Sequence, residues 1–407
     1  MMTAVSKGDG ENNGVSYQSP TEETLTQISS SSTTPDNSID APSLPFDLVT
    51  EILCWIPVKF LLQFCCVCKS WNYLISHDSE FQKKHFRLST TIHDRLHLIL
   101  TPRPSASREF LLSDILISSI FNNNLSTITA TPLNYPLTPN RGRSFGGVSY
   151  RHGIFCFGID ESSALLFNPS IRKFKLLPPL ENPPLNHYLQ TNYTLVYHRF
   201  TDNYKIVAVS LDINRQININ THTFGTNYWT KIQNIPYCCR LRGVGISVSD
   251  TVNWLVYDVS GSSSSLWVIL SLDLEEYSYR KFLQPLSNER SDSKMVFQEL
   301  KGCLCILSND ANHSDVWIMK EHGNEQSWTK LLSVPYMADD RSFLYSSTIY
   351  VSEDDQVLMR LLKLRKFGFI IYDFKNNTFK IPKIQNINDQ MRPTIYVESL
   401  ISLFSQY

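Results

Sequence analysis

Apolar and polar positions follow three different patterns along this chain. Residues 1–43 are rich in Ser, Thr, Asn, Gly and Pro and hold few residues able to bury themselves, a composition typical of disorder. Residues 44–86 carry apolar side chains at helical spacing, whereas residues 90–407 contain short apolar runs separated by turn residues. The pattern predicts a disordered N-terminal tail, a small α-helical unit and a large all-β domain.

The first helix expected in residues 44–86 is apolar on two sides. It should start near Leu44-Pro45 and end before Pro57, which disfavours helical geometry in the residue preceding it. The two faces carry Leu48, Ile52 and Trp55, and Val49, Leu53 and Ile56. Two apolar faces need two partners, and a unit this small is near the limit at which a core is stable alone. We expect another protein to share the surplus apolar surface.

The stretch of residues 48–68 is the most apolar of the chain and raises two other possibilities. A membrane span would carry Glu51, Lys59 and a central Pro57 into hydrocarbon, where one charge at the centre costs about 3 kcal/mol. A zinc site would have to use its cysteines, which are Cys54, Cys65, Cys66 and Cys68. We expect neither, and interpret the cysteines as buried free thiols.

Charge and composition exclude further classes. The 37 basic and 38 acidic residues nearly cancel, so no overall field favours nucleic acid or an anionic membrane. Residues 1–43 contain no apolar segment typical of a secretory signal. We therefore expect a protein of the cytosol or nucleus, where thiols stay reduced.

The β domain contains an internal repeat. Several segments share an aromatic residue followed shortly by proline, and these aromatics recur about every 50 residues, the period of a kelch-like blade of four strands. They are Phe174, Trp229, Tyr279, Trp328 and Phe379. With a less clear unit before the first, the repeat predicts a propeller of about six blades, in which Trp229 and Trp328 are equivalent. The late run "TIYVESLISLF" should pair with the first blade and cover its edge.

No constellation typical of catalysis or metal binding is present in the sequence. His93 and His97 are the only close histidine pair, and in a strand context we interpret them as ordinary surface. Cys303 and Cys305 should lie on one strand face as core. The motifs G-x-S-x-G, H-E-x-x-H and the P-loop do not occur. We predict no catalytic residue, no metal and no cofactor, although some propellers are enzymes.

The segment "LPFDLVTEILCWIPVKFLLQFCCVCKSWNYLISHDSEFQKKHF" combines a Leu-Pro start, a Val-Cys-Lys-x-Trp run and a Leu-Ile-Ser close. In these features residues 44–86 resemble an F-box, the domain that docks on the Skp adaptor of Skp-cullin-F-box ubiquitin ligases. It departs from the family pattern at Trp55, Phe60, Gln63 and Cys65. The resemblance implies adaptor contacts at Leu44, Pro45, Leu48, Ile52, Leu53, Pro57, Leu61, Leu62, Val67 and Trp71.

The segments "LLFNPSIRKFKLLPPL", "VWIMKEHGNEQSWTKL" and "IYVESLISL" give residues 90–407 a resemblance of their own. This part is similar to the F-box-associated interaction domain of plant F-box and kelch-repeat proteins. Two turns depart from that pattern. "SYRHGIFC" stands where relatives often have Ser-Cys-Asn-Gly, and Asp250-Thr251 stands in place of Asn-Gly.

Three functions remain open at this point. The resemblance favours a non-catalytic substrate receptor, in which the F-box binds a Skp-type adaptor, and through it a cullin-RING ligase, while the propeller recruits a protein for ubiquitination. The alternatives are an adaptor-bound scaffold that sequesters its partner and a propeller enzyme. The sequence does not identify the substrate or its binding residues, although the loops "SGSSSSL" and "LENPPLNHYLQ" are candidates for contact.

Overall fold

The computed structural model places most of the chain, and Phe46–Tyr407 forms one compact unit. The residues it describes are 44–102, 112–122, 127–133, 147–160, 162–181, 191–211, 216–232, 235, 239–258, 266–285, 295–310, 312–337, 343–363, 366–387 and 391–403. The predicted tail of residues 1–43 and most of the loops "SGSSSSL" and "LENPPLNHYLQ" lie outside them. The predicted domain boundaries stay predictions.

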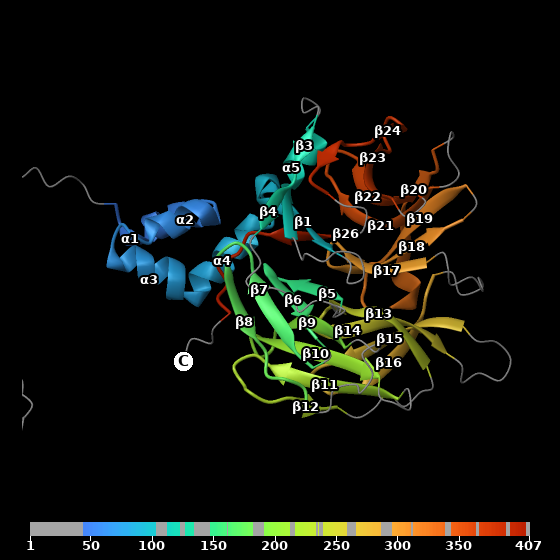
Figure 1. Cartoon of the computed structure of the whole chain (residues 1–407), viewed down its shortest axis with the longest axis horizontal. Coiled ribbons are helices and arrows are strands. Elements are labelled where there is room, and N and C mark those ends of the chain that lie inside the picture. Colours follow the sequence, from blue (N-terminus) through green and yellow to red (C-terminus); the bar gives the residue numbers. More distant parts are fainter. Residues whose placement is uncertain are drawn as a thin grey trace, which may run out of the picture. The chain divides into compact units, whose positions relative to one another are not determined.

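The helical unit contains four short helices, which Figure 1 shows in blue. They are α1 (Phe46–Cys54), α2 (Val58–Phe64), α3 (Lys69–His77) and α4 (Ser79–Ser89). Pro57 immediately precedes α2, where its missing N–H group costs no helical hydrogen bond. The Asp78 carboxylate caps α4 by accepting a hydrogen bond of 2.9 Å from the Phe81 backbone N–H.

The β domain is a propeller of six four-stranded sheets, as the sequence predicted. Five of the blades are built from consecutive antiparallel strands (Figure 1). They are β5 (Val148–Arg151), β6 (Ile154–Gly158), β7 (Ala164–Asn168) and β8 (Lys173–Leu176); β9 (Asn192–His198), β10 (Asn203–Leu211), β11 (Ile217–Thr223) and β12 (Thr230–Lys231); β13 (Cys239–Val248), β14 (Thr251–Asp258), β15 (Leu266–Asp273) and β16 (Tyr279–Leu283); β17 (Met295–Leu300), β18 (Cys303–Asn309), β19 (His313–Met319) and β20 (Trp328–Pro335); β21 (Phe343–Val351), β22 (Gln356–Lys363), β23 (Lys366–Asp373) and β24 (Thr378–Lys380).

The sixth blade joins both ends of the propeller sequence. Its strands are β26 (Met391–Val397), β1 (Leu96–Pro102), β2 (Leu112–Leu116) and β4 (Thr131–Leu133), in that order. The expected pairing of the late strand is confirmed, because β26 runs antiparallel to β1 along the whole of both strands. Smaller elements are α5 (Ile117–Phe121), the 3-10 turns His93–Arg95 and Glu325–Ser327, and a parallel pair of β3 (Ile128–Thr129) with β25 (Ile384–Gln385).

The two repeat tryptophans are equivalent, as predicted. Trp229 immediately precedes the outer strand β12 and Trp328 begins the outer strand β20. Each indole N–H donates a hydrogen bond to a backbone carbonyl near the outer strand of the preceding blade, at 2.7 Å to Pro178 and 3.2 Å to Leu283. The repeated aromatic therefore joins neighbouring blades as well as filling the space between them. The prediction for Cys305 is also correct, since it is fully buried.

The two turns that depart from the family pattern keep tight hairpin geometry. Strands β5 and β6 are joined by His152 (φ 47°) and Gly153 (φ 82°), and β13 and β14 by Ser249 (φ 49°) and Asp250 (φ 63°). Positive φ at both central residues is typical of the type I′ turn that fits the twist of paired strands. For Ser249 and His152 this conformation is unfavourable, so the surrounding structure must hold it.

The inner strands enclose a central channel of about 450 Å³. Residues of β5, β13, β17, β21 and β26 line it. Turns between the first and second strands of the blades therefore meet at one mouth of the channel, close to α4 (Figure 1).

Candidate functional site

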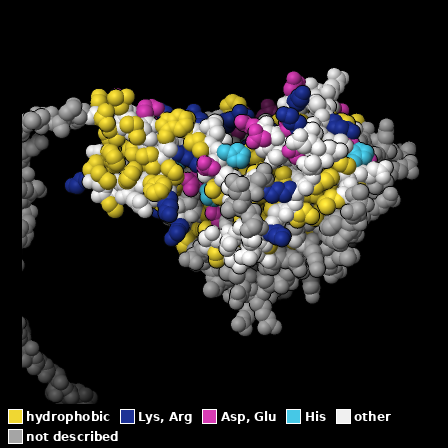
Figure 2. All heavy atoms as spheres, turned by 90° about the horizontal axis from the view of Figure 1, so that it is seen from above, with side chains coloured by type: hydrophobic (Ala, Val, Ile, Leu, Met, Phe, Trp, Pro, Cys, Tyr) yellow, Lys and Arg dark blue, Asp and Glu magenta, His cyan; other side chains and the backbone are white. Residues whose placement is uncertain are grey.

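The helical unit exposes a large apolar surface. Figure 2 shows hydrophobic side chains gathered over the end of the molecule that holds these helices. We define the F-box apolar surface as Phe46, Leu48, Ile52, Trp55, Phe60, Leu62, Val67 and Tyr73, which are 39% to 64% exposed. Exposed apolar side chains in such number on four short helices indicate a contact surface for another protein.

The two apolar faces predicted for the first helix are both present. Leu53 points into the helical core, where Val49 and Ile56 pack beside it. Ile52 and Trp55 lie on the other face and are 52% and 56% exposed. One of the two predicted faces therefore packs in the interior, and the other is exposed.

The structure divides the predicted adaptor contacts into three groups. Leu53 and Leu61 are 1% and 0% exposed, so neither side chain can touch a partner while the helices stay packed. Pro57 and Trp71 are half-buried, and Trp71 packs edge-to-face on Phe64. The exposed residues are Leu44, Pro45, Leu48, Ile52, Leu62 and Val67. For these six, contact with an adaptor stays a prediction.

Four exposed apolar residues were absent from the predicted contacts. They are Phe46, Trp55, Phe60 and Tyr73. Helical spacing placed Trp55 on the face of Leu48 and Ile52, but Trp55 and Phe60 were set aside as departures from the family pattern. The hydrophobic periodicity was the better guide for Trp55, because it groups Trp55 with the exposed Leu48 and Ile52 on one face of the helix.

Three hydrogen bonds fasten the helices to the chain that enters and closes the propeller. The Val58 backbone N–H donates to the Glu398 carboxylate at 3.1 Å. The Arg95 guanidinium, 3% exposed, donates to the Trp55 carbonyl and, at 2.8 Å, to the Ser89 hydroxyl. Leu400 completes the helical core from the propeller side. The F-box apolar surface is therefore held in one orientation relative to the propeller.

The prediction that His97 is ordinary surface is wrong. His97 lies on β1 with only 15% of its side chain exposed, between Asp114 at 3.0 Å and Glu398 at 3.6 Å. Burial alone would lower the pKa of His97, but its hydrogen bonds to both carboxylates outweigh burial and raise the pKa to about 9. Burial opposes the ionisation of Glu398 too, yet the bonds from His97 and Val58 hold its pKa below the usual value.

This raised pKa predicts a loss of stability in mildly alkaline solution. Folded His97 keeps its proton between pH 6.5 and about 9, where the unfolded residue releases it. The contribution of protonated His97 to the free energy of unfolding is at most about 3 kcal/mol. It is complete below pH 6.5 and disappears as the pH rises through 9. Urea unfolding at about pH 6 and about pH 9.5 measures the difference. The His97→Gln variant should be less stable than the wild type at the lower pH and lose less on alkalinisation; equal losses would contradict the assignment.

The cysteines of the helical unit are free, but only Cys54 is fully buried. Cys66 and Cys68 are exposed, so the prediction of buried thiols is wrong for these two, because α2 ends before them and they lie on the connection to α3. Across the described ranges, no three His, Cys, Asp or Glu residues lie close enough together to hold a metal ion. Among the helices in these same ranges, none is long and apolar enough to cross a membrane.

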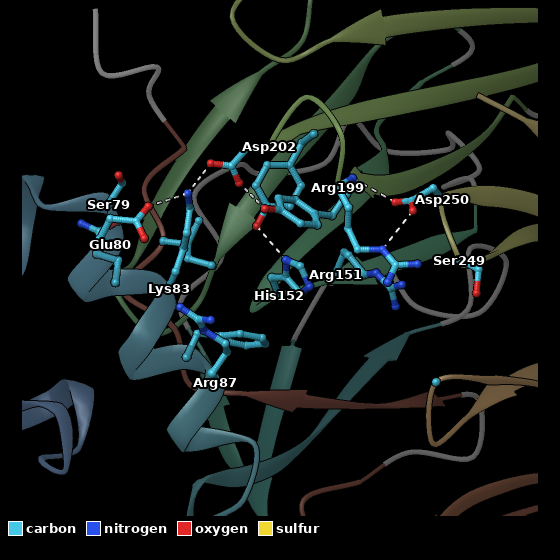
Figure 3. A pocket seen from close by; sticks show the side chains of 16 residues that line it. Ser79, Glu80, Lys83, Arg87, Arg151, His152, Arg199, Asp202, Ser249 and Asp250 are labelled. Atoms are coloured by element: carbon cyan, nitrogen blue, oxygen red, sulfur yellow. Dashed lines mark hydrogen bonds and ion pairs between the residues drawn. The ribbon is translucent and has the colours of Figure 1, made fainter. Parts of the chain in front are cut away.

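A second site is a hollow of about 760 Å³ between α4 and the propeller turns. Figure 3 shows its charged and polar side chains converging from these elements. Helix α4 provides Lys83 and Arg87, the β5–β6 hairpin provides Arg151 and His152, and the β9–β10 hairpin contributes Arg199 among others. The hollow thus lies where the helical unit and the propeller meet.

Comparison with protein families identifies both parts. Residues 42–83 match the F-box domain, and residues 110–403 match the F-box associated beta propeller domain. The chain therefore belongs to the F-box proteins that carry an F-box-associated β-propeller. This pair of domains is consistent with an F-box substrate receptor.

Individual relatives agree with this family. An F-box/kelch-repeat protein of Arabidopsis thaliana is 29% identical over 375 residues, which cover 88% of this chain and 96% of the relative. F-box protein CPR1 of the same plant is 23% identical over 386 residues, covering 88% and 89%. Among solved structures, TolB from Acinetobacter baumannii is similar with a TM-score of 0.45 and 10% identity over 78% of this chain and 73% of that one.

Proposed function

We propose that this chain is the substrate-recognition subunit of a Skp-cullin-F-box ubiquitin ligase. The F-box apolar surface supports the proposal most strongly, because side chains such as Ile52 and Trp55 remain more than half exposed although the helices already pack around a buried core. Exposure of such an apolar surface to water is unfavourable, and a bound partner removes that cost by burying it. In an F-box, that partner is a Skp-type adaptor.

The propeller recruits the protein to be modified. Its turns sit on a rigid ring of six blades, a common way to present variable contact residues. The hydrogen bonds of Glu398 and Arg95 hold the ring against the F-box helices, so a bound protein is kept at a fixed place relative to the adaptor. Such tethering raises the effective concentration of target lysines near the ubiquitin-conjugating enzyme to about the millimolar range. The receptor needs no catalytic residue of its own, and it works where these ligases work, in the cytosol or nucleus.

A reconstituted ligase tests this function. The full chain, produced with a Skp-type adaptor, cullin and RING subunit, is expected to co-purify with the cullin and to support ubiquitin transfer to proteins captured by the propeller. Capture without transfer or change in target half-life would favour a sequestering scaffold. Turnover of a small molecule by the chain alone, without cullin binding, would replace the proposal with a propeller enzyme.

A further inference from the structure

The hollow beside α4 has walls from both domains of the chain. Lys83 and Arg87 come from the last helix of the helical unit, whereas Arg151, Arg199 and Asp250 come from three propeller hairpins (Figure 3). Its volume of about 760 Å³ lies within the range of binding pockets for molecules of several hundred daltons. It is large enough for a few residues of an extended peptide.

Most charges around the hollow already have partners. The Lys83 ammonium forms ion pairs with Asp202 and, at 3.0 Å, with Glu80. The Arg199 guanidinium binds the Asp250 carboxylate at 2.9 Å, and the Arg199 backbone N–H donates to the same carboxylate. All three carboxylates that line the hollow, those of Glu80, Asp202 and Asp250, are therefore already paired.

Two guanidinium groups remain. Over the described ranges, the side chains of Arg87 and Arg151 make no hydrogen bond or ion pair, and the Nε of Arg151 is buried without a partner. A buried donor that lacks an acceptor is unfavourable, and few such groups persist in native proteins without a role. Both side chains line the same cavity, and guanidinium groups present donors suited to carboxylate or phosphate oxygens.

Between these arginines the wall is aromatic and uncharged. The His152 ring packs against Phe86, with centroids 5.0 Å apart, and against Tyr197 at 4.7 Å. Its Nδ1 lies 3.1 Å from the Tyr204 hydroxyl. Burial lowers the pKa of His152 to about 4, so the ring is neutral at cellular pH. The ring therefore fixes α4 against the propeller and offers the ligand an apolar surface.

We propose that this hollow binds an acidic peptide segment of the recruited protein, with Arg87 and Arg151 supplying the donors for its anionic side chain. A polyanion such as nucleic acid fits poorly, because the lining carries Lys83 and three arginines against Glu80, Asp202 and Asp250, an excess of only one positive charge. A single carboxylate or phosphoserine beside apolar residues matches both the charge and the aromatic wall. The inference rests on the proposed receptor function, and it places the target at the junction of the F-box and the propeller.

Fluorescence anisotropy with the full chain bound to its adaptor tests the proposal. The probes are three labelled nonapeptide pools of random flanks with a fixed central Glu, phosphoserine or Gln. We expect the Glu or the phosphoserine pool to bind at least about 10-fold more tightly than the Gln pool, since one charge-assisted pair is worth about 1.5–3 kcal/mol. The pool that binds more tightly shows whether the hollow prefers a carboxylate or a phosphoserine. Equal binding of all three pools would overturn the proposal.

Variants separate the hollow from the rest of the surface. Arg87→Gln with Arg151→Gln should weaken binding of the preferred pool about 10- to 100-fold. The matched control is Arg172→Gln with Arg280→Gln, two exposed arginines away from the hollow, which should bind as the wild type does. If the Arg151 change lowers the melting temperature, the exposed Arg87→Glu alone provides the test, and unchanged binding by it would refute the site.

The outcome is independent of adaptor binding. Co-purification with the adaptor should be the same for the wild type, the arginine variants and the control. Loss of peptide binding with adaptor binding intact would support the hollow as the peptide site. Failure of the wild-type complex to ubiquitinate a captured protein, with peptide binding intact, would instead refute the ligase function and leave the peptide site standing.

Discussion

A chain carrying both Leu48→Glu and Ile52→Glu is expected to lose affinity for a Skp-type adaptor by a factor of about 1000. Both side chains are exposed on α1, by 50% and 52%, so the substitutions should leave folding unchanged. In a complex, each glutamate would have to be buried against apolar groups, at a cost of about 2 kcal/mol or more. Two such costs amount to about 4 kcal/mol, or three decades in the dissociation constant. Surface plasmon resonance with immobilised adaptor measures the change.

The propeller offers a closely matched control. Leu176 and Ile381 are 52% and 50% exposed, so Leu176→Glu with Ile381→Glu makes the same chemical change at the same exposure away from the helices. This control should bind the adaptor normally. If the two double variants bound equally well, the F-box apolar surface would not be the docking site.

The interior leucines need a different interpretation. Leu53→Ala removes a side chain that is 1% exposed within the helical core, and the cavity is expected to destabilise the helices by about 2–5 kcal/mol. Lost adaptor binding in that variant would report unfolding of the helices and not a missing contact. Only exposed residues such as Ile52 can test docking directly.

Sequence periodicity predicted two apolar faces on α1 but not which one lies inside. The two sets of residues are similarly apolar, so nothing local distinguishes them. The choice is made by Leu400 and Glu398, which reach the helices from the other end of the chain. The contacts predicted from the family pattern likewise include both interior residues such as Leu61 and exposed ones such as Leu62. Both groups follow helical spacing, so spacing alone does not separate them.

The repeat in the β domain was a stronger signal. The repeated aromatics recur about every 50 residues, which predicted the number of blades, and Trp229 and Trp328 make equivalent bonds to the preceding blade. The environment of His97 was not predictable, because Asp114 reaches it from the neighbouring strand β2 and Glu398 follows β26, which pairs with β1 only when the ring closes. The hollow was missed for a similar reason, since Arg87 and Arg151 line one cavity only after α4 packs against the propeller turns.

Removal of the chain from Met391 onwards is expected to abolish cooperative folding of the propeller. Strand β26 pairs with β1 over seven residue pairs, from Leu96 with Val397 to Pro102 with Met391. Without it, β1 becomes an open edge along the central channel and loses the inner strand of its blade. The truncated chain would therefore expose both a hydrogen-bonding edge and an apolar cavity.

The expected loss of stability follows from the side chains that the removed segment buries. Tyr396, Leu400 and Leu403 are 4%, 3% and 0% exposed, and loss of each large buried side chain costs about 2–5 kcal/mol. Together these losses are comparable to the whole stability of a typical domain, about 5–15 kcal/mol. The Asn168 side-chain amide would also lose its acceptors, the carbonyls of Ser399 and Ile401 at 3.0 Å each.

Circular dichroism during thermal unfolding, together with limited proteolysis, measures this effect. The chain that ends before Met391 should show no cooperative transition and be digested rapidly throughout the propeller. The matched control ends after Leu403 and retains β26 and its buried side chains, so it should melt as the full chain does. A cooperative transition within a few degrees of the control would mean that closure by β26 is dispensable.

Because the same segment carries Glu398, the bond to Val58 on the helical unit is lost with it. Ring closure and the orientation of the F-box apolar surface should therefore fail together.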